Sequence, residues 1–133
     1  MSFRLADLTL PILGAPMAGG PSTPALAAAV SGAGGLGNLP GGYLTAQRLA
    51  EDIVSARALT GGPLGVNLFV PQPCIATTEQ LDGYRELLVP LAQRYGVEPG
   101  RPRVDDDDWQ AKLDVVADTA PEAVSFTFGC PGP

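Results

Sequence analysis

The stretch SGAGGLGNLPGG, residues 31–42, decides between two folds, because its glycines fit either of them. Gly32, Gly34 and Gly37 match G-x-G-x-x-G, the dinucleotide-binding fingerprint. In a Rossmann fold that pattern follows a strand and opens a helix, whose N-terminus binds the pyrophosphate. Here the order is reversed, since a helix is expected before the glycines and a strand after them. The stretch therefore favours a helix-to-strand loop, in which glycine ends the helix and lets the strand pack closely, over a dinucleotide site.

Outward from this loop, apolar strands alternate with amphipathic helices. The pattern predicts strands at 8–17, 35–39, 64–70 and 123–129, and helices at 24–33, 45–59, 77–97 and 105–120. Thr23 and Thr45 are expected N-caps, and Pro24 suits the first helical position. Pro90 is expected to kink or split the third helix. Alternation of this kind predicts the α/β class, with parallel strands and right-handed crossovers.

Helical spacing indicates which helix faces are buried. One apolar face is expected on each of the three later helices, and Thr77 with Gln80 can form a capping box. The residues expected on these faces are Leu49, Ile53 and Ala56; Leu81, Leu88, Leu91 and Tyr95; and Trp109, Leu113 and Val116.

The composition disfavours several classes of function. The 133 residues are 45% hydrophobic and 17% charged, which is typical of one globular domain. The net charge of −6 disfavours nucleic-acid binding, and no apolar run is long enough for a membrane span or a signal peptide. Cys74 and Cys130 lack metal or redox spacing, so reduced thiols and a cytoplasmic location are expected. The absence of histidine removes the commonest general base and metal ligand.

The predicted elements look like part of a larger fold. Four βα units are about half of a TIM (β/α)8 barrel, which typically needs about 250 residues. The final GCPGP stands where another helix is expected. We therefore expect residues 1–133 to be a single partial domain, the N-terminal half of a longer barrel. The alternative is a small open α/β domain that stands alone or dimerises, and exposed strand edges would favour homodimers or aggregation.

Two parts of the sequence are candidates for a ligand-binding site. GAPMAGGPS, residues 14–22, follows the first strand, and its small residues would let a flat ligand approach the backbone around Met17. Asn67 is an amide in the apolar run GVNLFVP, so it needs hydrogen-bond partners, and a ligand is one candidate. The alternatives are a plain strand-to-helix loop for 14–22 and an Asn67 that caps the following loop.

The run DDDD, residues 105–108, has two interpretations. Carboxylates could hold a metal, but no further ligand recurs at a fixed spacing. Acidic residues at the start of a helix are favoured by the helix dipole, and that is the interpretation preferred here. No metal site is predicted.

Four segments resemble the nitronate monooxygenase family, also called 2-nitropropane dioxygenase-like proteins. They are PILGAPMAGG, AVSGAGGLGNL, LTGGPLGVNLFVPQP and VSFTFGCP, in the family's order over nearly the whole chain. These proteins are FMN-dependent TIM barrels. The related FMN-dependent enoyl-acyl-carrier-protein reductases share A-G-G-L-G, but the APM and VNLF versions favour the nitronate group.

The resemblance implies a set of FMN contacts. Ala15, Pro16 and Met17 would lie against the flavin ring through their backbone, and Asn67 would contact FMN with its side chain. Ser125 and Thr127 belong to a strand end near the cofactor, 125–129. Members often read S-F-H-F-G there, and Thr127 stands in the histidine's place. The family's catalytic histidine lies in a later G-G-H segment, so no catalytic residue is expected in this chain.

The implied reaction is oxidation of an alkyl nitronate by O2 through FMN, for which this chain alone would be incomplete. Two alternatives remain: an FMN-dependent enoyl-thioester reductase that uses NAD(P)H, and a half-barrel fragment without catalysis.

Overall fold

The structure, a computed structural model, describes residues 3–132. The chain divides into two units. The sheet unit takes the chain up to Pro71 and again from Asp106, and the helical unit is Gln72–Asp105. Each unit is described by itself below.

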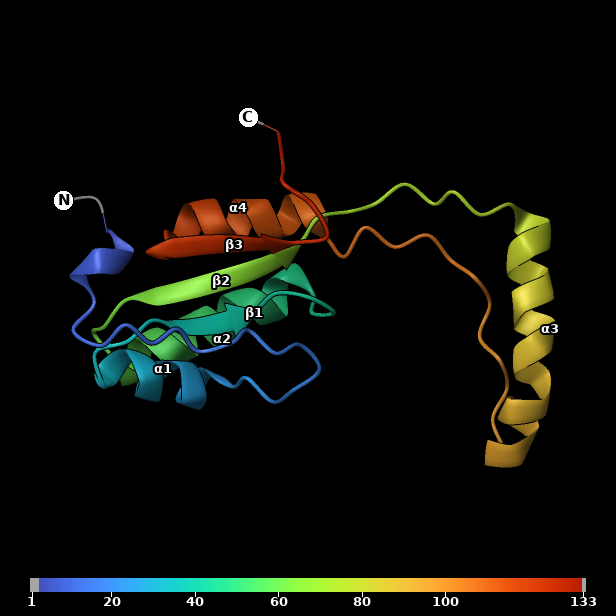
Figure 1. The fold of residues 1–133 in the computed structure, drawn as a ribbon, viewed down its shortest axis with the longest axis horizontal. Helices are drawn as coiled ribbons and strands as arrows, with labels where there is room; N and C mark the ends of the chain where they lie inside the picture. The colour runs from blue at the N-terminus through green and yellow to red at the C-terminus, as the bar shows by residue number, and fades with distance from the viewer. Residues whose placement is uncertain (1–2, 133) are drawn as a thin grey trace. The chain divides into compact units, whose positions relative to one another are not determined.

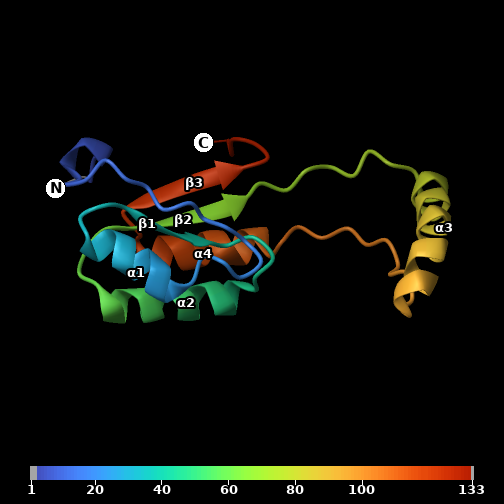
Figure 2. The same cartoon turned by 60° about the horizontal axis from the view of Figure 1, so that its bottom comes forward.

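The sheet unit is a parallel α/β structure. Its sheet has the strand order β1-β2-β3, and both strand pairs are parallel. Helices α1, α2 and α4 cover one face of the sheet (Figures 1 and 2), and a short 3-10 helix, Leu5–Asp7, lies near the start. The α/β class predicted from the sequence is confirmed. The elements are β1 (Gly37–Pro40), β2 (Leu64–Phe69), β3 (Ala123–Thr127), α1 (Pro24–Gly32), α2 (Ala46–Leu59) and α4 (Trp109–Thr119).

The strand predicted at 8–17 is reduced to a single parallel bridge between Leu13 and Leu36. Around this bridge the Leu36 N–H donates to the Ile12 carbonyl, and the Gly14 N–H donates to the Leu36 carbonyl, both at 2.9 Å. The prediction was wrong in extent because Pro11 and Pro16 have no N–H to donate to a longer ladder. The segment still runs beside β1, but the sheet has three strands.

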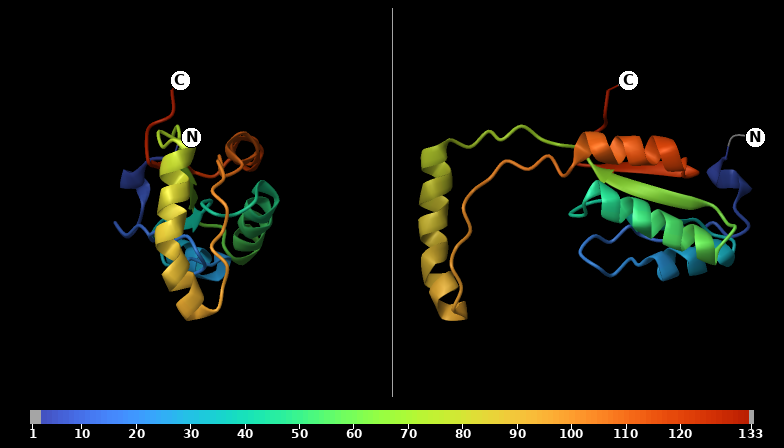
Figure 3. Two further views of the ribbon diagram at one scale, coloured as in Figure 1. Left: turned by 90° about the vertical axis from the view of Figure 1, so that its right-hand side faces the viewer. Right: turned by 180° about the vertical axis from the view of Figure 1, so that it is seen from behind.

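One apolar core lies between the sheet and its helices. The view from behind in Figure 3 shows the helix layer that covers it. The predicted face of α2 is fully buried, and the predicted face of α4 packs against the same cluster, so both predictions are confirmed. The buried members are Ala27, Leu39, Leu49, Ile53, Ala56, Leu64, Val66 and Leu68, and the α4 residues packed on them include Trp109, Leu113 and Val116.

Helix starts follow the sequence closely. The Thr23 hydroxyl accepts from the Leu26 N–H at 3.2 Å, and Pro24 is the first helical residue. The Thr45 hydroxyl accepts from the Arg48 N–H, also at 3.2 Å. Both predicted caps are confirmed.

The helical unit contains α3 (Thr78–Tyr95). Thr77 and Gln80 form the predicted capping box, with bonds of 2.9 and 3.2 Å. The helix continues unbroken through Pro90, so it is not split there, and Gly96 ends it in the left-handed conformation. Within this unit the predicted apolar face remains largely exposed at Leu88, Leu91 and Tyr95.

The helix predicted at 105–120 begins later than expected, so the acidic run 105–108 does not form its first turn. Helix α4 begins at Trp109, and the Asp108 side chain makes no cap bond to it. Instead Asp108 Oδ2 accepts from the Ala46 N–H at 3.2 Å, at the first residue of α2. The backbone of Asp107 and Asp108 is left-handed, with φ of 57° and 53°. The carboxylate therefore complements the dipole of α2.

Glu122 joins the start of β3 to α2 and β2. Its Oε2 accepts from Arg57 Nη2 at 2.7 Å and from the Leu64 N–H at 2.8 Å. Burial raises the pKa of this carboxyl, but the hydrogen bonds from Arg57, from the Leu64 N–H and from its own N–H, with the charge of Arg57, outweigh burial, so the pKa lies below its usual value. Ionised Glu122 therefore stabilises the fold at pH values above the unfolded pKa of about 4.3.

Replacing Glu122 with glutamine is expected to lower the free energy of unfolding by about 1 kcal/mol at pH 7, because a charge-assisted bond is lost at a partly exposed site. The difference from wild type should shrink as the pH falls through the folded pKa, since the wild-type carboxyl is then protonated too. Urea unfolding between pH 7 and pH 3 measures this, with Glu51→Gln as an exposed control. A difference that stays constant over that range would rule out the ionised pair as its cause.

Candidate functional site

The helix-free face of the sheet carries the polar side chains. Along β2 the side chains alternate, so that Val66 and Leu68 face the helices and Asn67 faces the other side. In the register of the sheet, Asn67 lies between Pro40 of β1 and Ser125 of β3. Parallel strands end at one edge, and Asn67 lies close to that carboxyl edge.

Asn67 bonds across to β3. Its Nδ2 donates to Ser125 Oγ at 2.9 Å, and Thr127 Oγ1 donates to Asn67 Oδ1 at 3.2 Å. Asn67 is only 5% exposed, whereas Ser125 is exposed and Thr127 half-buried. The structure thus brings together three of the side chains singled out in the sequence.

Residues 15–17 form a tight turn that is closed by Ser22. The Ser22 hydroxyl donates to the Ala15 carbonyl at 2.7 Å and accepts from the Met17 N–H at 2.9 Å. The side chains of Ala15 and Met17 remain exposed, and Pro16 is half-buried. The Met17 N–H thus has a partner inside the loop, and the loop presents small or flexible side chains outward.

Asn38 is a site residue that sequence reasoning missed. It lies on the same face as Asn67, one strand away, and its Nδ2 donates to the Gly14 carbonyl at 2.9 Å. Its Oδ1 occupies the space where a Cβ of Gly65 would stand. The signal was available, because Asn38 is also an amide in a short apolar strand that must find hydrogen bonds.

A depression of about 480 Å³ opens on this face of the sheet unit. Ala15, Pro16 and Ser125 line it, whereas Met17, Asn67 and Thr127 do not. Ser125 therefore links the hydrogen-bonded group around Asn67 to the depression. Its other lining residues are Phe3, Leu5, Leu13, Gly14, Leu36, Asn38, Glu122, Ala123 and Val124, so one charged side chain is among them. Apolar walls with a few convergent polar groups suit a flat heteroaromatic ligand, so the residues present fit such a group.

Aromatic rings cluster at the carboxyl ends of the strands. Phe69 meets Tyr43 and Phe128 edge to face, with ring centroids 5.3 and 4.9 Å apart. A Cβ at Gly42 would collide with the Phe69 ring. Sequence reasoning gave these rings no role, because their separation along the chain hides that they meet.

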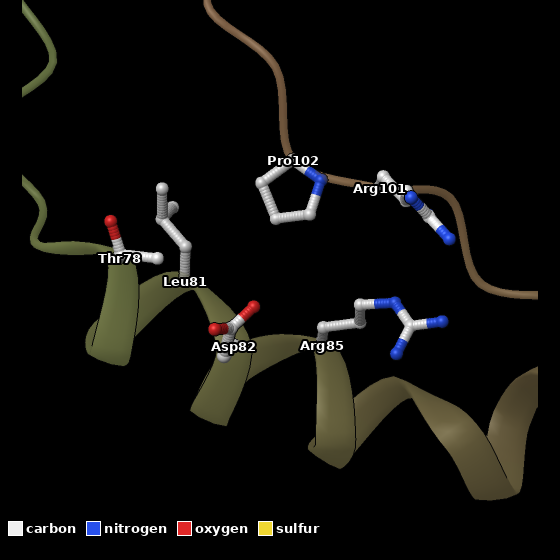
Figure 4. Close-up of a pocket in the computed structure, with 6 residues that line it drawn as sticks. All are labelled: Thr78, Leu81, Asp82, Arg85, Arg101 and Pro102. Atoms are coloured by element: carbon white, nitrogen blue, oxygen red, sulfur yellow. The ribbon is translucent and has the colours of Figure 1, made fainter.

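The helical unit has a separate pocket of about 420 Å³ (Figure 4). The side chains of Asp82 and Arg85 on α3 face the segment that carries Arg101 and Pro102. Arg85 Nε donates to the Gly100 carbonyl at 3.2 Å. None of the residues singled out in the sequence as cofactor contacts lies here.

Among residues 3–132, no three acidic, cysteine or histidine side chains gather as a metal site would require, and no helix has the length and apolar character to cross a membrane. Cys74 and Cys130 are both exposed and form no disulfide.

Comparison with known proteins gives a consistent family. A family model described as nitronate monooxygenase matches residues 3–133. A probable nitronate monooxygenase of Staphylococcus saprophyticus is 37% identical over 128 residues, and one of Bacillus subtilis is 38% identical over 126 residues. These alignments cover 96% and 94% of this chain but 36% of each relative, so the chain spans about a third of their length.

A solved structure agrees with the sequence relatives. A nitroalkane oxidase from Streptomyces ansochromogenes superposes with a TM-score of 0.87 and is 46% identical. The match covers 96% of this chain and 36% of that chain. The parallel sheet and its helices thus correspond to part of a larger barrel.

Proposed function

The chain belongs to the nitronate monooxygenase family, and we propose that its protein is an FMN-dependent oxidoreductase that oxidises alkyl nitronates with O2. One observation carries the proposal. Hydrogen bonds join Asn67 to Ser125 and Thr127 on the helix-free face of the parallel sheet, and Ser125 lines one depression together with Ala15 and Pro16. The family resemblance assigns all five of these residues to FMN. Sites in βα structures form where such strands end.

The chain's own residues would hold the flavin in two ways. The small side chains of exposed Ala15 and half-buried Pro16 would lie against the ring plane. Asn67 would orient the ring edge by hydrogen bonding, with its amide held in place by Ser125 and Thr127. When bound, FMN supplies the redox chemistry, taking electrons from the nitronate and passing them to O2. No residue of this chain is proposed as a catalytic acid or base.

The compartment and partners follow from the same proposal. The protein would act on a small-molecule nitronate with O2 in the cytoplasm, where the exposed thiols of Cys74 and Cys130 stay reduced.

The reaction is tested with the whole protein. Oxygen consumption on addition of an alkyl nitronate, dependent on added FMN, is the expected result. Oxidation of NAD(P)H coupled to a crotonyl-type thioester, with no nitronate turnover, would instead support a reductase and contradict the proposal.

Asn67→Ala is expected to raise the FMN dissociation constant at least about tenfold, which corresponds to about 1.4 kcal/mol. The variant loses one bond to the ligand and also leaves Ser125 and Thr127 without their partner. Titration with FMN, followed by quenching of flavin fluorescence, measures the constant.

The matched control for Asn67→Ala is Ser31→Ala. The Ser31 hydroxyl is also buried and makes two bonds, at 2.6 and 3.0 Å, but at the amino ends of the strands. The Ser31→Ala variant should have a lower free energy of unfolding and an unchanged FMN dissociation constant. Equal affinities for Asn67→Ala and wild type would exclude Asn67 from the flavin site.

A further inference from the structure

Ser22 holds together the turn that bears Ala15, Pro16 and Met17. It is 8% exposed, and its one hydroxyl bonds to both sides of Pro16, donating to the Ala15 carbonyl and accepting from the Met17 N–H. The Ser22 N–H also donates to the Met17 carbonyl at 3.4 Å. A single side chain thus satisfies two backbone groups of the turn.

The loop is restricted by Pro16 and Pro21 and by a bond from the Met17 N–H to the Ala15 carbonyl at 3.0 Å, but its two glycines leave it flexible. Gly19 and Gly20 both have positive φ, 83° and 118°, and nothing lies within 4 Å of where a Cβ would stand on either. Fixing the backbone costs about 1–2 kcal/mol per residue, and glycine loses the most freedom. Loss of the Ser22 hydroxyl would therefore widen the range of conformations open to residues 15–22.

Asn38 fixes the residue just before the turn. Its Nδ2 donates to the Gly14 carbonyl, so two consecutive carbonyls, of Gly14 and Ala15, are held by side chains from different parts of the chain. Ser22 precedes α1, and Asn38 belongs to β1. The turn is therefore anchored to the helix layer and to the sheet at once.

We propose that Ser22 and Asn38 are positioning residues that hold the Ala15–Met17 turn in its ligand-ready shape before FMN arrives. The inference rests on the proposed function, since FMN is the group that the turn would meet. Pre-organisation of this kind lowers the entropy lost on binding, so it strengthens affinity without a contact to the ligand.

Two readouts test the role of Ser22 in the whole protein. In Ser22→Ala, amide hydrogen exchange of residues 15–22 without FMN should become at least about tenfold faster, because the Met17 N–H keeps only its bond to the Ala15 carbonyl at 3.0 Å. The FMN dissociation constant should rise about ten- to a hundredfold. Asn38→Ala should change both quantities in the same direction.

Matched variants separate positioning from stability. Ser22→Thr and Ser22→Val have nearly the same shape, and only the threonine keeps the hydroxyl, so Thr should stay close to wild type and Val should resemble Ala. Ser31→Ala loses a buried serine with the same two kinds of bond at the other end of the sheet, and should leave loop exchange and FMN affinity within about twofold of wild type.

The outcomes are distinguishable. Faster exchange with weaker FMN binding supports the proposal, and so does rescue of both by threonine but not valine. Unchanged exchange in Ser22→Ala, or faster exchange with unchanged affinity, overturns it. If wild type itself takes up no FMN, the proposed function fails, and exchange in the FMN-free variants still shows whether Ser22 holds the turn.

Discussion

The Gly37→Ala variant is expected to lose about 3 kcal/mol or more of the free energy of unfolding, because a methyl group at this position has no room. A Cβ on Gly37 would overlap the Ala27 carbonyl oxygen and come within 2.7 Å of the Ala27 Cα. Both are backbone atoms of α1, so the clash cannot be relieved by a change of side-chain rotamer. To accept the methyl group, α1 would have to lift away from β1 and open the core around Ala27 and Leu39.

Urea unfolding followed by far-ultraviolet circular dichroism measures the loss. The control is Gly61→Ala, since nothing lies within 4 Å of its Cβ position. That variant should stay within about 0.5 kcal/mol of wild type. Equal stabilities of Gly37→Ala and Gly61→Ala would show that α1 and β1 are not packed as described.

The glycines of 31–42 thus serve packing, as their order along the chain indicated. Helix α1 precedes them and β1 follows them, the reverse of a Rossmann loop. Gly34 has φ of 98°, which favours glycine, and a Cβ on Gly35 would come within 2.6 Å of the Ile12 carbonyl oxygen. The helix-to-strand interpretation is confirmed.

The second large effect is expected at Lys112. This lysine is 1% exposed, and its Nζ lies 2.8 Å from Asp107 Oδ2. Lys112→Ala removes the partner of a half-buried carboxylate and leaves a cavity beside the core. Breaking a buried ion pair on one side costs about 3–5 kcal/mol, so the free energy of unfolding should fall by about that amount.

The control is an exposed ion pair with the same distance between nitrogen and oxygen. Arg4 and Asp7 are also 2.8 Å apart, but their side chains are 75% and 43% exposed. Arg4→Ala should change the free energy of unfolding by less than about 1 kcal/mol. In the double variant Lys112→Met, Asp107→Asn, part of the loss should return, because neither side chain is then charged. A loss for Lys112→Ala no larger than that for Arg4→Ala would refute the structural role of the pair.

This ion pair also explains why the acidic run was misinterpreted. Asp107 pairs with Lys112, and its Oδ1 accepts from the Tyr43 N–H at 2.9 Å. Asp108 bonds to Ala46. The run therefore ties the start of α4 to the start of α2, residues about 60 positions apart, and spacing alone contains no signal for such a contact.

Elements with strong periodicity could be predicted, because the spacing of apolar residues within one segment determines which face is buried. Leu49, Ile53 and Ala56 are one such face, and the caps at Thr23 and Thr45 are decided within three residues. The first strand was overestimated because an apolar run suggests a full ladder even where prolines remove its donors.

The site was partly predictable. Asn67 stands out as an amide among apolar residues, and the structure gives it Ser125 and Thr127 as partners. Asn38 offered the same signal, an amide in a short apolar strand. The partners of Ser22 and Asn38 depend on turn geometry and on neighbouring strands, which composition does not encode.

The central claim is that FMN binds on the helix-free face of this sheet. Amide hydrogen exchange of the whole protein, with and without saturating FMN, tests it most directly. The account predicts protection on FMN binding in segments 14–22, 67–70 and 125–129, with 46–59 on the covered face unchanged. No protection in those three segments, or protection confined to 72–105, would contradict it.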